Sequence, residues 1–158
     1  MKKAIFAGTF DPFTLGHLSV VKSALNMGFD LTVAVCEKSK SGVDVDSRME
    51  IVRRTVSKEN NVKIGSFNGF LTDYMKKNGI TILVRGLRNT IDFEYEKNLY
   101  YLYKDMMPEI EICYVLTDRE KSFVSSSNVR EILSLNGDAS AYVSSEALGL
   151  INNLYGVK

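Results

Sequence analysis

The feature that most constrains the fold is a regular alternation of short apolar runs with segments of helical periodicity. Five runs are expected to be strands, and they lie at residues 3–7, 31–36, 62–67, 80–84 and 110–116. The runs are mostly apolar rather than strictly alternating, which is typical of parallel sheets covered on both faces. The pattern therefore predicts an α/β fold: a Rossmann-like, doubly wound, five-stranded parallel sheet with helices on both faces.

The helices are expected between and after these strands. Apolar residues recur at helical spacing from residue 17 to about residue 27, and Gly28 and Gly79 are expected to end the first and third helices. The remaining helices are expected over about residues 46–57, 71–78 and 91–107, from residue 125, and over residues 145–155. Asp46 or Ser47 is the expected N-cap of the second helix.

Length and charge narrow the functional classes. The 158 residues are predicted to form one domain, residues 1–158. A formal net charge of +1 argues against nucleic acid as a general partner. No apolar run approaches the ~20 residues needed to cross a bilayer, and the first residues do not resemble a secretory signal, so we expect a cytoplasmic protein with no membrane partner. Cys36 and Cys113 lie in apolar runs and indicate no zinc site.

The first candidate site follows the first expected strand. In doubly wound sheets, ligands bind beyond the carboxyl ends of the strands. Residues 8–17 there read GTFDPFTLGH and end in His17, the single histidine of the chain. His17 falls on the first turn of a helix, where free N–H groups and the helix dipole favour a phosphate. The string matches neither GxGxxG nor GxxxxGK[ST], which argues against a dehydrogenase and a P-loop enzyme.

Three further strand ends carry cations or hydroxyl groups. Residues 85–88 read RGLR, and two guanidinium groups at this spacing can straddle a polyphosphate; residues 92–96 then read DFEYE. Residues 121–127 read KSFVSSS, which places serine hydroxyls at an expected helix start. Residues 38–42 read KSKSG, a loop whose lysine we expect to close on a phosphate.

These strings resemble a known family. Thr14-x-Gly16-His17 is similar to the (H/T)xGH motif of the nucleotidyltransferase superfamily, and RGLR, DFEYE and the serine run resemble, more narrowly, the phosphopantetheine adenylyltransferases. The resemblance extends from Lys3 to about Leu135. It implies transfer of the adenylyl group of ATP to 4′-phosphopantetheine, giving dephospho-coenzyme A and pyrophosphate in coenzyme A biosynthesis. It also implies Mg²⁺ as cofactor and a homohexamer.

The resemblance further implies a set of site residues. The implied catalytic residues are His17, which is expected to stabilise the transition state, Lys40 (or, as the alternative, Lys38) and Arg88. The implied acceptor-binding residues are Thr9, Lys40, Leu71 and Arg85. The implied ATP-binding residues are Thr9, Phe10, His17, Gly86, Leu87, Arg88, Glu96, Lys121, Ser122, Phe123, Val124, Ser125, Ser126 and Ser127. No protein metal ligand is expected, because Mg²⁺ would be held mainly by ATP phosphates and water.

The expected chemistry is direct in-line attack by the acceptor phosphate, since no serine, cysteine or carboxylate stands beside an activating base. Two alternatives stay open. One is a nucleotidyltransferase with another acceptor, such as nicotinamide mononucleotide, or with CTP; RGLR and DFEYE argue against it. The other is an inactive nucleotide-binding module, and Thr9, His17, Arg88 and the serines argue against that. Tyr103 stands where the family usually carries asparagine.

Overall fold

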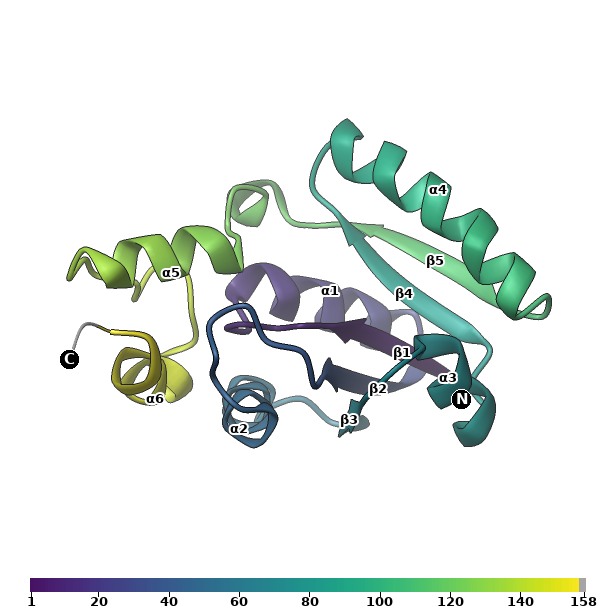
Figure 1. Cartoon of the computed structure of the whole chain (residues 1–158), viewed down its shortest axis with the longest axis horizontal. Coiled ribbons are helices and arrows are strands. Elements are labelled where there is room, and N and C mark those ends of the chain that lie inside the picture. The colour runs from purple at the N-terminus through teal and green to yellow at the C-terminus, as the bar shows by residue number, and fades with distance from the viewer. Residues whose placement is uncertain (157–158) are drawn as a thin grey trace.

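The computed structural model describes residues 1–156 and contains one sheet of five parallel strands (Figure 1). Across the sheet their order is β3 (Val62–Phe67), β2 (Phe29–Cys36), β1 (Lys2–Gly8), β4 (Ile82–Leu87) and β5 (Glu111–Leu116). All four strand pairs are parallel. The strand order reverses between β1 and β4, which is the point where sheets of this kind bind ligands. The predicted fold class is confirmed.

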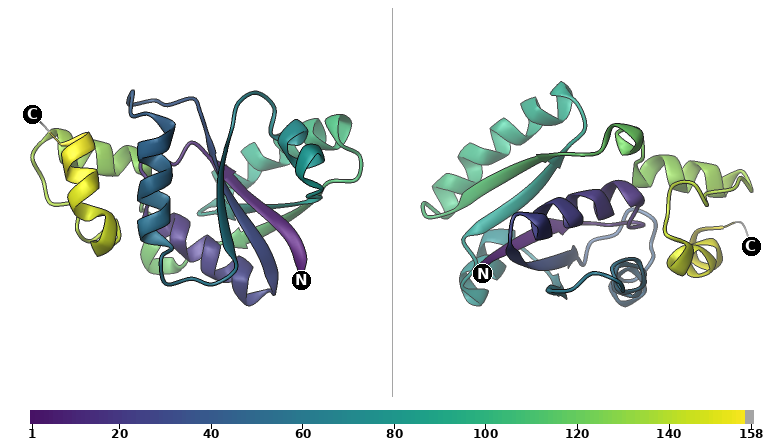
Figure 2. Two further views of the ribbon diagram at one scale, coloured as in Figure 1. Left: turned by 90° about the horizontal axis from the view of Figure 1, so that it is seen from below. Right: turned by 180° about the vertical axis from the view of Figure 1, so that it is seen from behind.

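Six α-helices and one 3₁₀ turn accompany the strands: α1 (Leu15–Asn26), α2 (Val45–Thr55), α3 (Leu71–Asn78), α4 (Thr90–Met106), η1 (Arg119–Lys121), α5 (Ser126–Ser134) and α6 (Ser145–Tyr155). The C-terminal helix α6 lies beside α2, far from α4 (Figures 1 and 2). No helix within residues 1–156 is both long and apolar enough to cross a membrane.

The central strand β1 explains why the strands are mostly apolar rather than strictly alternating. Ala4 and Phe6 point into an apolar cluster that contains side chains of α1, α2, α5 and α6. Ile5 and Ala7 point into a second cluster, which contains side chains of α3 and the end of α4. Successive side chains of a strand face opposite sides, so a sheet covered on both faces needs apolar residues at every position.

Two local predictions were wrong. Strand β4 does not end at residue 84 but continues to Leu87, because the backbone of Arg85 and Gly86 keeps pairing with β5. The N-cap of α2 is neither Asp46 nor Ser47 but Asp44, whose carboxylate accepts the Ser47 N–H at 2.8 Å. The 3₁₀ turn η1 was not predicted from the sequence.

Candidate active site

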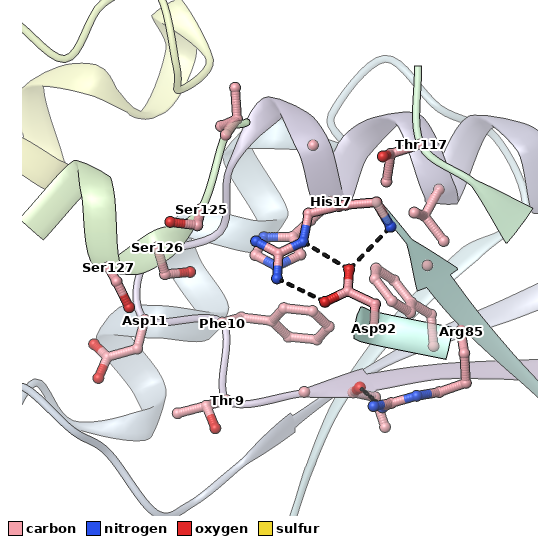
Figure 3. Close-up of a pocket in the computed structure, with 18 of the residues that line it drawn as sticks. Thr9, Phe10, Asp11, His17, Arg85, Asp92, Thr117, Ser125, Ser126 and Ser127 are labelled. Carbon is pink, nitrogen blue, oxygen red and sulfur yellow. Dashed lines mark hydrogen bonds and ion pairs between the residues drawn. The ribbon is translucent and has the colours of Figure 1, made fainter. Parts of the chain in front are cut away.

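A cavity of about 540 Å³ opens at the carboxyl ends of β1 and β4, at the reversal of strand order. It is lined by most of the residues expected to bind ATP or the acceptor: Thr9, Phe10, His17, Lys40, Arg85, Gly86, Arg88, Glu96, Val124, Ser125, Ser126 and Ser127. Figure 3 shows His17 between the three serines of α5 and Asp92, with Thr9 and Arg85 across the cavity. The topology thus brings four separate sequence motifs to one place.

His17 is held in a defined orientation by the start of α1. Thr14 is the N-cap, and the Thr14 N–H donates to Nδ1 of His17 at 3.0 Å, while the His17 N–H donates to the Thr14 hydroxyl at 3.4 Å. This reciprocal arrangement is a capping box in which histidine takes the place of the usual glutamate. Because Nδ1 accepts a hydrogen bond, the neutral ring carries its hydrogen on Nε2. The ring is therefore prepared to donate from Nε2.

The surroundings of His17 keep the ring uncharged. The rings of Phe10 and Phe13 lie 5.0 and 5.1 Å from the imidazole, and that of Phe6 lies 6.2 Å away. Burial, and secondarily the positive charge of Arg88, lower the pKa of His17 to about 4. At neutral pH His17 is therefore a neutral hydrogen-bond donor and not a second cation.

Phe10 reaches its place under His17 through an unusual backbone conformation. Its φ of 47° lies in the left-handed region, which costs energy for a residue other than glycine. The buried Phe10 ring packs against Phe6 and Phe13 as well as His17, and this packing offsets the cost. The strained residue thus sits at the site itself.

Gly86 is required by the approach of β4 to α1. A Cβ atom at this position would lie 2.7 Å from Cγ2 of Val20. Glycine therefore lets the strand pass directly beside the first turns of α1, next to His17.

Two arginines from the RGLR string are each paired with a carboxylate of α4. Arg85 donates from Nε to both oxygens of Glu96, at 2.9 and 3.0 Å, and from Nη2 to the same carboxylate. Glu96 is only 4% exposed, so this pair is buried. Arg88 donates from Nε to Asp92 at 3.0 Å, and this second pair is more exposed.

The three serines of α5 have distinct local roles. Ser125 caps the helix by accepting the Asn128 N–H, and Ser126 donates to the carbonyl oxygen of Pro12 at 2.7 Å. Ser127 accepts from Arg130 at 3.3 Å. All three line the cavity at a helix N-terminus, which is a favourable place for phosphate oxygens.

A second cavity of about 360 Å³ adjoins the first. Leu71, the residue expected to contact the acceptor, lines it together with Tyr103 and apolar side chains of α3 and α4. Ala7, Gly8, Thr9 and Arg85 line both cavities. Two ligands, one in each cavity, would therefore meet at these four residues.

Some expected residues lie elsewhere. Lys40 lines the main cavity, whereas Lys38 lines neither of the two, so the geometry favours Lys40. Neither cavity is lined by Leu87, Lys121, Ser122 or Phe123. Leu87 is buried in the core, and Phe123 is exposed on the surface.

Comparison with known proteins identifies the family. The cytidylyltransferase-like family matches residues 5–132. A phosphopantetheine adenylyltransferase of Heliobacterium modesticaldum is 37% identical over 99% of this chain and 94% of its own length. One of Nautilia profundicola is 38% identical over 92% of this chain and 96% of its own length. The chain belongs to the phosphopantetheine adenylyltransferase family.

Solved structures agree on the fold. A protein of Vibrio parahaemolyticus, 21% identical, superposes with a TM-score of 0.74 over 100% of this chain and 98% of its own. The nicotinic acid mononucleotide adenylyltransferase of Plasmodium falciparum, 17% identical, superposes with a TM-score of 0.69 over 98% of this chain and 96% of its own. The phosphopantetheine adenylyltransferase fold is therefore shared with nucleotidyltransferases of other names.

Sequence reasoning missed several residues of this phosphopantetheine adenylyltransferase cavity. Asp11, Asp92, Tyr95, Thr117 and Arg130 also line it. Asp11 lies within GTFDPFTLGH and Asp92 within DFEYE, two strings that the sequence already assigned to the site. Their positions alone could therefore have identified them as cavity residues. Arg130 lies one turn into α5, and its place beside Ser127 follows from helical spacing. Thr117 follows β5 directly, and its location at a strand end is the only sequence signal that could have indicated its place in the cavity.

The carboxylates around the cavity are already engaged. Asp92 pairs with Arg88, Glu96 with Arg85, and Asp11 accepts hydrogen bonds from the loop after β2. Within residues 1–156 no three His, Cys, Asp or Glu side chains gather as a metal site. Each of these three carboxylates therefore already has a hydrogen-bonding partner within the protein.

Proposed function

We propose that the protein transfers the adenylyl group of ATP to 4′-phosphopantetheine, forming dephospho-coenzyme A and pyrophosphate. The observation that carries the proposal is the meeting of two cavities at Ala7, Gly8, Thr9 and Arg85, beside the neutral His17. ATP would occupy the larger cavity and the acceptor the smaller one. The acceptor phosphate would then face the α-phosphate of ATP at the shared wall.

His17 would act on the group being transferred. Its Nε2–H, left free by the Thr14 N–H on Nδ1, would donate to an α-phosphoryl oxygen as charge develops there. A neutral donor gives this bond without repelling Arg88, which would hold the β- and γ-phosphates together with the α5 serines. Nothing in this arrangement requires a covalent intermediate, because the acceptor brings its own nucleophilic oxygen.

The acceptor would be held by Lys40, Thr9 and Arg85. Arg85 keeps its guanidinium near the shared wall through Glu96 and through the Ala7 carbonyl oxygen, to which Nη1 donates at 3.2 Å. Both oxygens of Glu96 accept from Arg85, so Glu96 would contribute by orienting Arg85. The apolar second cavity suits the extended pantetheine arm better than a charged nucleotide acceptor.

The test supplies the protein with ATP, Mg²⁺ and 4′-phosphopantetheine and follows pyrophosphate and dephospho-coenzyme A. Parallel reactions replace the acceptor with nicotinamide mononucleotide, or ATP with CTP. We expect product only with ATP and 4′-phosphopantetheine. Turnover restricted to nicotinamide mononucleotide would refute the proposed acceptor, and no pyrophosphate with any pair would favour an inactive nucleotide-binding module.

We further propose that Mg²⁺ enters with ATP, held by phosphates and water, and that the enzyme works as a cytoplasmic homohexamer. The engaged carboxylates of the cavity support the first point. The family resemblance supports the second, as do exposed apolar side chains such as Ile91 and Leu102 on α4. Chelation with EDTA should abolish turnover, and light scattering should give six times the chain mass; a monomer would refute the assembly.

A further inference from the structure

The loop that carries Lys40, residues 37–43 and hereafter the Lys40 loop, is fastened to one buried carboxylate. Asp11 is 2% exposed, and its Oδ2 accepts the N–H groups of Lys40 at 2.8 Å and Ser41 at 3.0 Å. The hydroxyl of Ser39 donates to the same oxygen at 3.0 Å, and that of Ser41 donates to Oδ1 at 2.6 Å. The middle of the loop is therefore tethered to Asp11.

A donor from the far end of the chain completes this cluster. The hydroxyl of Tyr155, the last residue of α6, donates to Oδ1 of Asp11 at 2.7 Å. It thus shares that oxygen with the Ser41 hydroxyl. Burial opposes ionisation of Asp11, but the bonds from Ser41, Tyr155 and the loop backbone outweigh it and lower the pKa to about 2.

A buried cation holds the ends of the same loop. Arg48 on α2 is fully buried and donates to the carbonyl oxygens of Cys36 and Glu37, each at 2.8 Å, and of Val43 at 3.0 Å. Its Nη1 also donates to the carbonyl oxygen of Thr9 at 2.6 Å. Arg48 belongs to α2 and Tyr155 to α6. Since α2 packs against α6, these two residues approach the loop from neighbouring helices.

We propose that Tyr155 is a positioning residue: acting through Asp11, it fixes the Lys40 loop so that Lys40 faces the cavity before the acceptor arrives. The proposal rests on the proposed function, in which Lys40 binds the acceptor phosphate. Arg48 holds the loop ends without Tyr155, so loss of the hydroxyl loosens the middle of the loop and leaves the fold intact. A pre-formed loop spares the ordering cost that binding would otherwise carry.

This role makes a specific kinetic prediction for Tyr155→Phe. Lys40 contacts the acceptor phosphate in the ground state and the transition state alike, so its loss of order should raise KM and leave kcat nearly unchanged. We expect KM for 4′-phosphopantetheine to rise about fivefold to tenfold, which is within the range that a typical intramolecular hydrogen bond contributes. KM for ATP should change less than about twofold. Tyr101→Phe, which removes the same hydroxyl from an exposed tyrosine of α4, is the matched control.

Hydrogen–deuterium exchange provides a readout that does not depend on substrate. Peptides covering the Lys40 loop should exchange about fivefold to tenfold faster in Tyr155→Phe, because the Lys40 and Ser41 N–H groups lose part of their protection. Peptides covering β1 should exchange at the wild-type rate. Faster exchange in both regions would indicate general destabilisation and refute a positioning role.

Ser41→Ala tests whether the effect passes through Asp11. Both hydroxyls meet Oδ1, so the KM effects of Tyr155→Phe and Ser41→Ala should combine non-additively in the double variant. Strict additivity, or unchanged exchange of the Lys40 loop in Tyr155→Phe, overturns the proposal whatever the substrate is. If the wild type makes no dephospho-coenzyme A while the loop exchange responds, the proposed function fails and the control of the loop by Tyr155 stands.

Discussion

Acidification should destabilise this protein through one residue, His17. It is the single histidine of the chain, and its aromatic surroundings and Arg88 lower its pKa from 6.5 to about 4. In the unfolded chain this pKa returns to its ordinary value. Between these two pKa values the unfolded chain binds a proton that the folded protein does not, so stability falls as the pH is lowered through this window. The full contribution of His17 to the free energy of unfolding is present above pH 6.5.

The size of the effect follows from the two pKa values. Lowering the pH from 7 to 5 should reduce the free energy of unfolding by about 2 kcal/mol. The carboxylates with lowered pKa values, Asp11 and Asp92 among them, act in the same direction but only at lower pH, because their ordinary pKa is 3.8. The range from pH 7 to 5 therefore isolates His17.

Urea unfolding at pH 7 and pH 5 measures this difference. In His17→Gln, which cannot titrate, most of the difference should vanish. The C2 proton of His17 should also show no titration between pH 8 and pH 5 in NMR spectra. A midpoint near 6.5, or an equal loss of stability in His17→Gln, would show that the ring is not held neutral by its surroundings.

Three substitutions test other parts of the site. His17→Ala should lower kcat about 10²–10³-fold, the usual cost of removing one transition-state donor, while the calorimetric Kd for ATP changes little; equal losses in both would contradict a transition-state role. Arg85→Ala should lower the free energy of unfolding by about 3 kcal/mol, because buried Glu96 loses its partner, and Glu96→Gln should recover part of it. Gly86→Ala should cost about 1–3 kcal/mol in urea unfolding, since its Cβ meets Val20, and the loss should shrink in Val20→Ala.

Local chemistry made much of the fold predictable. Helix α3 was placed correctly because Gly79, at φ 62°, ends it. Helix α6 was placed correctly because apolar residues recur at helical spacing after Ser145. The end of β4 was misplaced because Arg85 and Gly86 interrupt its apolar run. The strand nevertheless continues, since Glu96 from α4 satisfies the Arg85 side chain inside the fold. A tertiary partner thus decided a boundary that periodicity could not.

The contacts that shape the acceptor side were beyond local reasoning. Asp11 meets the Lys40 loop about 30 residues later and Tyr155 144 residues later. Arg48 lies within the helix expected over residues 46–57, and nothing in the neighbouring sequence distinguishes it. It is nevertheless fully buried and donates to four carbonyl oxygens. Burial of such groups depends on how helices α2 and α6 pack over the strand ends, and no sequence window contains both sides of that contact.

Two of the four cationic side chains that line the main cavity, Arg85 and Arg88, are each paired with a carboxylate. Arg85 and Glu96 form a buried pair that is costly to separate, so Arg85 should keep this partner when ligands bind. Arg88 and Asp92 form a more exposed pair, which contributes little to the stability of the fold. Arg88 can therefore leave Asp92 and bind a ligand. A ligand must bring several negative charges to replace Asp92 at Arg88 and also engage the α5 serines. We therefore expect the pairing of Arg88 with Asp92 to favour a polyphosphate over a single anion.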